Sequence, residues 1–309
     1  MSDAACAPGL FAARVVASYG RHFLVEDDAV ALFEARRRGK RGDVVVGDRV
    51  CCLAAGAGQA AIESILPRAS LLLRADGARS KLLAANVARV VVVFAPRPTF
   101  NERFVWRALL AATAADVKSL AVLNKTDLDD QGSGRRALDA LARLGYATAA
   151  VSARAEPEAA RERLRAALGA DSNLLVGQSG MGKSTLINLL APQANARTQE
   201  YSVRLDLGRQ TTTAARLFAL AGGGDIIDTP GFQSFGLAHL DPVRLAAAMP
   251  EFAPLLGECR FADCRHLAEP DCAIRAAVRS GTIDSGRYAF FAELCGELDR
   301  LRERERQPA

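Results

Sequence analysis

The stretch GQSGMGKST, Gly177–Thr185, lies between an apolar run typical of a buried strand and a second run long enough for a helix. Gly177 and Gly182 precede Lys183 and Ser184 at the spacing of a phosphate-binding loop, whose backbone N–H groups face phosphate oxygens at a helix N-terminus. We expect Lys183 to reach the β- and γ-phosphates and Ser184 to ligate Mg²⁺. A chance glycine-rich turn is the alternative, but it leaves both flanking runs unexplained. The candidate phosphate contacts are Gly177, Gln178, Ser179, Gly180, Met181, Gly182, Lys183, Ser184 and Thr185.

A second stretch, LAVLNKTDL at Leu120–Leu128, joins an apolar strand to a polar turn that carries Asn124, Lys125, Thr126 and Asp127. The Asp127 carboxylate can accept hydrogen bonds from the ring N1–H and the exocyclic amine of guanine, and the Asn124 amide can bind another edge. The Lys125 stem can lie along the ring. The turn therefore predicts a guanine site.

The second half of the metal site is predicted downstream, in GGGDIIDTPG and in the threonine run that precedes it. Asp228 ends an apolar strand, where its carboxylate can hold a water on Mg²⁺, and Gly231 can donate its backbone N–H to the γ-phosphate. One of Thr211, Thr212 and Thr213 is expected to complete the Mg²⁺ shell when the triphosphate is bound, with Thr212 or Thr213 favoured over Thr211.

These motifs occur in a rotated order. The base-reading turn comes first, a Ser-Ala turn (Ser152 and Ala153) for guanine O6 comes second, and the phosphate loop and Gly231 come last. Strand-like and helix-like runs alternate over residues 86–235, which predicts a mainly parallel sheet with helices on both faces. Such a sheet tolerates circular permutation where the original termini lie close together. As a result, Gly231 leads directly into the C-terminal region, and we hypothesise that hydrolysis repositions that region.

Slow intrinsic turnover is expected because Phe232 directly follows Asp-Thr-Pro-Gly. In many GTP-dependent switches a glutamine at this position orients the attacking water, whereas a phenyl ring neither hydrogen-bonds nor transfers a proton. The missing group would then be supplied or ordered by a partner.

The N-terminal region, residues 1–75, contains short β-like runs broken by glycines, which favours a small β-barrel or sandwich. A basic tract within it is expected to form a loop between strands. Two interpretations stay open: a contact with an RNA backbone, or a solvated charged loop. The basic residues of the tract are Arg36, Arg37, Arg38, Lys40 and Arg41.

Near the C-terminus, Cys259, Cys264, His266 and Cys272 lie within fourteen positions. Three thiolates and one imidazole make a closed tetrahedral zinc site with no open position for catalysis. Buried free cysteines beside a surface histidine are the alternative. The other cysteines are expected to be structural or incidental: Cys6, Cys51, Cys52 and Cys295.

The composition restricts the class of protein. The 309 residues carry a formal net charge of +5, which permits an anionic partner such as RNA without requiring one. No apolar run is long enough to span a bilayer, and the N-terminus does not have the pattern of a secretory signal. Seven cysteines, two of them adjacent, argue against a secreted disulfide framework and for the reducing cytoplasm.

The permuted order, together with DTPGF and CRFADCRHLAEPDCAI, resembles the ribosome small-subunit-dependent GTPases of the RsgA family. The resemblance implies an N-terminal OB-fold for RNA binding (1–75), a circularly permuted P-loop GTPase domain (76–240) and a mostly helical zinc domain (241–309). It implies a monomer that binds GTP and GDP, the small ribosomal subunit and its rRNA, assists late maturation of that subunit and is stimulated by it. In one departure, the family's histidine before the threonine run is Gln210 here, and glutamine cannot exchange a proton near neutral pH.

Two hypotheses about function remain. In the first, the protein is a GTP hydrolase. In the second, it is an RNA-binding assembly factor whose conformation is set by GTP and whose turnover is incidental. A third, an ATP-dependent nucleic-acid remodeller, conflicts with Asn124 and Asp127.

Overall fold

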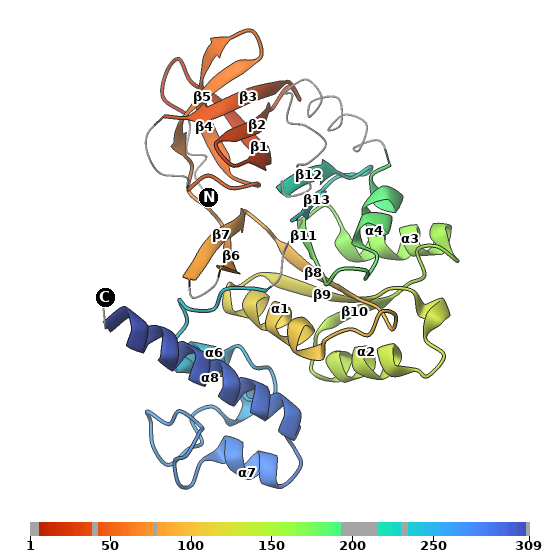
Figure 1. The fold of residues 1–309 in the computed structure, drawn as a ribbon, viewed down its shortest axis with the longest axis vertical. Helices are drawn as coiled ribbons and strands as arrows, with labels where there is room; N and C mark the ends of the chain where they lie inside the picture. Colours follow the sequence, from red (N-terminus) through yellow and green to blue (C-terminus); the bar gives the residue numbers. More distant parts are fainter. Residues whose placement is uncertain (1–5, 39–42, 77–78, 193–214, 230–233, 307–309) are drawn as a thin grey trace.

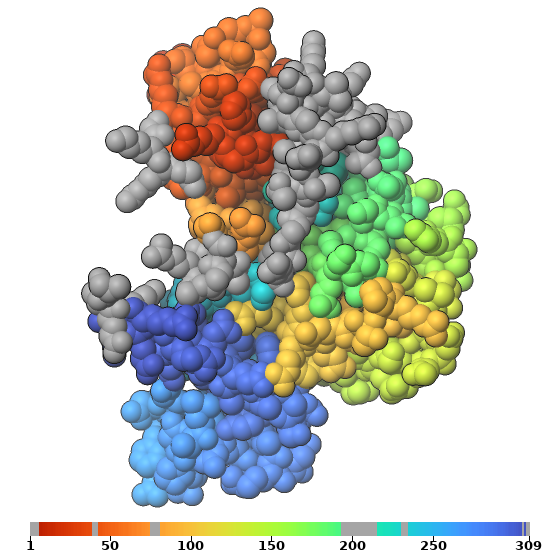
Figure 2. All heavy atoms as spheres, viewed as in Figure 1, coloured from red at the N-terminus to blue at the C-terminus, as the bar shows by residue number. Residues whose placement is uncertain are grey.

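The computed structural model describes residues 6–38, 43–76, 79–192, 215–229 and 234–306. The barrel and the C-terminal helices lie at opposite ends of the long axis, with an α/β domain between them (Figure 1, Figure 2). Among the described helices, none has both the length and the apolar composition that crossing a bilayer requires.

The N-terminal region is a closed barrel of five strands. Gly20, with φ of 78°, divides the first predicted β-run into two strands. The strands are hydrogen-bonded in the order β1-β2-β3-β5-β4, and an antiparallel β1–β4 pairing closes the barrel. This arrangement confirms the predicted OB-type barrel. The strands are β1 (Phe11–Tyr19), β2 (His22–Asp27), β3 (Leu32–Arg37), β4 (Arg49–Gly56) and β5 (Gln59–Ile65).

The described part of the basic tract differs from the loop that we expected. Arg36 and Arg37 lie in β3, because pairing with β2 and β5 extends that strand to its basic end. Arg37 forms an ion pair with Asp43, and Arg38 pairs with Glu63 at 3.0 Å. Lys40 and Arg41 lie outside the described residues.

Cys6 and Cys51, which we expected to be structural or incidental, form a disulfide and are therefore structural. The bridge ties the segment before β1 to β4. Spacing does not predict this pair, since 45 residues separate the two cysteines. Cys52 and Cys295 are free and buried.

After the barrel, the hairpin of β6 (Leu71–Asp76) and β7 (Arg79–Ala85) crosses the predicted boundary at residue 75. The chain then enters the α/β sheet. Its strands are β8 (Arg89–Phe94), β9 (Lys118–Leu123), β10 (Ala147–Ala150), β11 (Ser172–Val176), β12 (Ala215–Ala219) and β13 (Asp225–Asp228). Its helices are α1 (Glu102–Ala114), α2 (Ser133–Arg143), α3 (Pro157–Leu168) and α4 (Lys183–Leu190), with a 3-10 turn η1 (Thr126–Leu128).

The order across this sheet is β10-β9-β8-β11-β13-β12, and all neighbours are parallel except β12 and β13. Strands buried on both faces read as continuous apolar runs, and β8 is such a strand from Val90 to Phe94. Helices α1 and α2 lie on one face, and α3 and α4 lie on the other (Figure 1).

The barrel is continuous with this sheet. Ala17 and Ser18 of β1 pair antiparallel with Arg216 and Ala215 of β12, so the two sheets form one eleven-stranded sheet. Nearby, Arg14 of β1 donates to the Asp225 carboxylate at 2.5 Å.

The C-terminal region consists of α6 (Pro242–Ala247), a 3-10 turn η2 (Ala253–Leu255), α7 (Ala273–Arg279) and α8 (Ser285–Arg306). Arginines of α1 hold α8 by ion pairs: Arg107 with Glu297 at 2.7 Å, and Arg103 with Glu293. Trp106 of α1 also packs edge-on against Phe290 of α8. The C-terminal helices are therefore attached to the first helix of the α/β domain.

Candidate nucleotide site and metal cluster

The base-reading turn and the phosphate loop line one cavity of about 430 Å³. It lies where β9, β10 and β11 reach their carboxyl ends, the edge at which open α/β sheets bind ligands. The base-reading turn precedes the phosphate loop in the chain, the reverse of the usual order, and the two nevertheless form opposite walls of one site. The predicted residues that line it are Asn124, Lys125, Asp127, Ser152, Ala153, Ser179, Gly180, Gly182, Lys183, Ser184 and Thr185.

Four of the predicted nucleotide-binding residues do not line the cavity and instead support it, namely Thr126, Gly177, Gln178 and Met181; Asp228, predicted for the metal site, is also outside the lining. The Thr126 N–H donates to Val151 O at 3.3 Å, joining the base turn to the segment after β10. A Cβ on Gly177 would lie 2.4 Å from Val93 O, so only glycine lets the loop pass this close to β8.

Asn124 connects three of the predicted motifs. Its side chain is buried; Nδ2 donates to Met181 O in the phosphate loop at 3.1 Å, and Oδ1 accepts from the Ala153 N–H at 3.2 Å. Gly182 has φ of 96°, and a Cβ there would lie 2.3 Å from Asn124 Nδ2. The base turn and the phosphate loop therefore fit together only with glycine at position 182.

Lys125 adds a second tie between the two walls. Its Nζ donates to Gly180 O at 2.7 Å and to Arg97 O at 2.9 Å. The left-handed φ of 58° at Lys125 turns the chain from β9 into η1. This turn exposes Asp127, whose carboxylate accepts a hydrogen bond from the Ser152 hydroxyl.

The phosphate end of the cavity carries opposing charges. Lys183 begins α4, and its Nζ donates to Gly177 O at 2.6 Å and Gln178 O at 3.0 Å. Burial lowers the pKa of Lys183 and raises the pKa of Asp228, and each charge favours the other's ionised form. The Ser184 hydroxyl and the Asp228 carboxylate are oxygen donors, the kind that Mg²⁺ prefers.

Several predicted residues lie outside the described part of the chain. They are Gln210, Thr212, Thr213, Gly231 and Phe232. Their roles at the γ-phosphate and in catalysis stay predictions.

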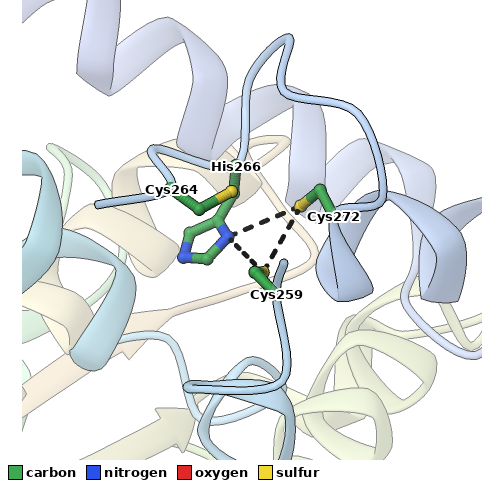
Figure 3. Close-up of side chains that lie close together, drawn as sticks. All are labelled: Cys259, Cys264, His266 and Cys272. Carbon is green, nitrogen blue, oxygen red and sulfur yellow. Dashed lines mark hydrogen bonds between the residues drawn. The ribbon is translucent and has the colours of Figure 1, made fainter. Parts of the chain in front are cut away.

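The four predicted metal ligands converge in the C-terminal region. Figure 3 shows their side chains pointing toward one centre, and the ligand atoms lie within 4.8 Å of one another. His266 Nδ1 is 3.4 Å from Cys259 Sγ and 3.5 Å from Cys272 Sγ, and the two Sγ atoms are 3.9 Å apart. A tetrahedral zinc ion with Zn–S of about 2.3 Å and Zn–N of about 2.0 Å needs ligand atoms about 3.5–3.8 Å apart. The cluster fits one metal ion.

The comparisons with known proteins agree with this geometry. The model of the RsgA GTPase family matches residues 65–238. The small ribosomal subunit biogenesis GTPase RsgA of Paraburkholderia phytofirmans is 49% identical over 294 residues, with 93% of each chain covered. The chain belongs to the RsgA GTPase family. A second relative of the same description, from Bordetella pertussis, is 45% identical over 285 residues, covering 92% of this chain and 95% of its own.

Solved structures give the same fold. YjeQ from Thermotoga maritima superposes with a TM-score of 0.70 at 28% identity, covering 94% of this chain and 98% of that chain. YloQ, described as a circularly permuted GTPase, has a TM-score of 0.67 at 23% identity and 97% coverage of both chains. The expected family, the permuted GTPase fold and the assignment as a GTP-hydrolysing enzyme are confirmed.

The structure adds residues that no motif indicated. Leu128 and Arg154 line the cavity beside the base turn. Asn101, which caps α1, donates its N–H to Gln178 Oε1 at 2.8 Å, and Pro98 lies against the position where Gly180 would carry a Cβ. Asn101 and Pro98 lie far in sequence from Gln178 and Gly180, so only the tertiary fold could show these two contacts.

Proposed function

We propose that this chain binds GTP in the 430 Å³ cavity and hydrolyses it to GDP and phosphate with Mg²⁺. The observation that carries this proposal is the meeting of the base turn and the phosphate loop around Asn124. Asp127 and Asn124 read guanine, and Ala153 offers its backbone to O6. The cavity that these residues share supports a guanine nucleotide as the ligand.

The triphosphate would lie along the phosphate loop. Its β- and γ-phosphates would replace Gly177 O and Gln178 O as partners of Lys183 Nζ, and the backbone N–H groups before α4 would face the phosphate oxygens. Ser184 would ligate Mg²⁺ directly, Asp228 would hold one of its waters, and Thr212 or Thr213 would complete its shell. Bound there, Mg²⁺ neutralises phosphate charge in the transition state. Gly231 is proposed to donate its N–H to the γ-phosphate.

The cluster of Cys259, Cys264, His266 and Cys272 is proposed to hold one structural zinc ion. All four positions of a tetrahedral ion are filled by protein atoms, which leaves none for a substrate. Cys272 also caps α7 by accepting the Arg275 N–H, so the metal would anchor the start of that helix.

The cellular role is taken from the relatives, which are described as small ribosomal subunit biogenesis GTPases. We place this chain in late maturation of the small subunit, as a cytoplasmic monomer, and divide it into the domains expected from the sequence. The barrel and the metal-binding region at the two ends would bind rRNA, and the subunit would stimulate hydrolysis. The net charge of +5 supports an RNA partner.

The deciding experiment measures GTP turnover by the full chain with and without small ribosomal subunits. We expect turnover below about 10 per second for the protein alone, a typical enzyme rate, and at least tenfold stimulation by small subunits. Large subunits serve as the control. Equal turnover under all three conditions would contradict stimulation, and ATP competing as well as GTP would contradict the nucleotide assignment.

A second candidate function, a GTP-set conformational switch, is favoured by one contact. Arg107 Nε donates to Phe235 O at 2.9 Å, and the same guanidinium binds Glu297 of α8. The backbone shortly after Asp-Thr-Pro-Gly is thus linked to the C-terminal helices. Hydrogen exchange of α8 should differ between the GDP-bound form and a form with a non-hydrolysable GTP analogue. Equal protection in both forms would count against the switch.

A further inference from the structure

Arg216 lies between the barrel and the carboxylate proposed to serve Mg²⁺. In β12 it pairs with Asp228 of β13 on one side and with Ala17 of β1 on the other. Residues directly opposite one another on paired strands project from the same face, so Arg216 and Asp228 emerge side by side. Tyr19 lies two residues beyond Ala17, and the Arg216 guanidinium is over its ring, 5.8 Å from the centroid.

Two cations act on Asp228. They are Lys183 and, directly opposite on the paired strand, Arg216. Lys183 belongs to the phosphate loop and would bind the nucleotide. Among the described residues, Arg216 has no carbonyl partner comparable to those of Lys183, and its guanidinium contacts the ring of Tyr19 in the barrel. The place of this charge relative to Asp228 is therefore set by another domain.

We infer that Arg216 is a positioning residue through which the barrel sets the affinity of the nucleotide site for Mg²⁺. The inference rests on the proposed function of that site. A cation close to Asp228 attracts the carboxylate and repels the divalent ion, so the two compete. The Tyr19 ring holds the guanidinium at the barrel and limits that competition. A movement of the barrel on an RNA partner would change the position of the charge and hence Mg²⁺ binding.

The test is a Mg²⁺ titration of the binding of a fluorescent, non-hydrolysable GTP analogue to the full-length protein. In Arg216→Gln, the Mg²⁺ concentration at half-maximal binding should fall about threefold to tenfold, because a nearby positive charge is removed. Arg216→Lys retains the charge and should stay within about twofold of the wild type.

The barrel's part is tested by Tyr19→Leu, which removes the ring. The released Arg216 side chain can then pair with Asp228, so the midpoint should rise by about threefold or more, opposite in sign to Arg216→Gln. Tyr19→Phe keeps the ring and should leave the midpoint unchanged. In the double variant Tyr19→Leu/Arg216→Gln, the midpoint should equal that of Arg216→Gln, since Tyr19 acts through Arg216.

The outcomes of the Mg²⁺ titrations distinguish a failure of the role inferred for Arg216 from a failure of the proposed function of the nucleotide site. If the wild type binds the analogue without any dependence on Mg²⁺, the proposed function fails. If the wild type shows that dependence but Arg216→Gln leaves the midpoint unchanged, the inference is overturned. It is also overturned if Tyr19→Leu shifts the midpoint equally with and without Arg216. Thermal unfolding of each variant identifies any that fail to fold. Tyr19→Phe, which keeps the ring, and Arg216→Lys, which keeps the charge, then still test the inference, because a large shift of the Mg²⁺ midpoint in either would contradict it.

Discussion

At the scale of single residues, some side chains of the predicted nucleotide site combine a proposed contact with the ligand and a structural hydrogen bond. Asn124 is proposed to read guanine, and its amide already joins the phosphate loop to Ala153. Asp127, by contrast, is exposed, and its carboxylate accepts a hydrogen bond from the Ser152 hydroxyl. Replacing Asp127 therefore tests base recognition with little effect on the fold.

Asp127→Asn should exchange guanine for xanthine nucleotides, because the amide donates where the carboxylate accepted. We expect GTP affinity to fall on the order of 100-fold, as in sites that lose a hydrogen-bond match with the substrate, and XTP affinity to rise. Competition binding with both nucleotides measures this. Asp139→Asn, on the exposed face of α2, is the matched control. Unchanged preference in Asp127→Asn would contradict the assignment.

Gly182→Ala should abolish nucleotide binding, since the added Cβ would lie 2.3 Å from Asn124 Nδ2 and force the two walls apart. The matched control is Gly145→Ala, which has a similar positive φ of 87° but no atom within 4 Å of the new Cβ. Both variants should lose about 1 kcal/mol of stability from the left-handed backbone. Thermal unfolding measures the loss of stability from backbone strain, and nucleotide titration measures the effect of the clash with Asn124. An equal loss of binding in Gly182→Ala and Gly145→Ala would contradict a specific role for that clash.

At the scale of elements, hydrophobic periodicity and the glycines that end runs predicted helices and strands. The apolar run predicted before the phosphate loop is β11, and α3 ends at Gly169. The sequence did not predict which distant segments pair with one another. The extension of β3 to Arg37 depends on hydrogen bonds to β2 and β5, and a basic composition gives no sign of them. The Cys6–Cys51 bridge was missed for the same reason.

The α1–α8 contact gives a pH-dependent prediction. Hydrogen bonds from Arg107 lower the pKa of Glu297. A lowered folded-state pKa stabilises the fold above the unfolded value of about 4.3, and this stabilisation is lost as the pH falls through the folded-state pKa. Because Glu297 is 38% exposed, solvent screening reduces the expected loss in Glu297→Gln to about 0.5–1 kcal/mol at pH 7.

The measurement is the difference in unfolding free energy between Glu297→Gln and the wild type at pH 7 and near pH 3. The difference should shrink at the lower pH. Glu303→Gln changes an exposed glutamate of the same helix and is the control. A difference that stays constant with pH would show that Arg107 does not stabilise the ionised form of Glu297.

At the scale of the whole molecule, three units are joined at the GTPase domain. The barrel attaches through β12, shortly after the threonine run, and the C-terminal helices attach through α1 and Phe235, shortly after Asp-Thr-Pro-Gly. The permuted order predicted the second attachment, because it sends the chain from Gly231 directly toward the C-terminus. The first depends on β1–β12 pairing, which the sequence could not show.

Metal removal should affect one unit only. The cluster contacts α7 and the loop before it, whereas the barrel and the nucleotide cavity are built from other residues. We expect one zinc ion per chain by elemental analysis. Chelation should increase hydrogen exchange in residues 257–281 and leave guanine-nucleotide affinity within about twofold. An iron content equal to one per chain would instead assign a different metal to the same ligands.

The continuity between β1 and β12 also bears on how the protein can be divided. Excising residues 1–65 would leave the outer side of β12 without its strand partner, next to the partly buried Leu217. An unpaired sheet margin of this kind recruits another chain. The truncated enzyme should therefore form concentration-dependent dimers in light scattering, and a charged replacement at Leu217 should return it to single chains.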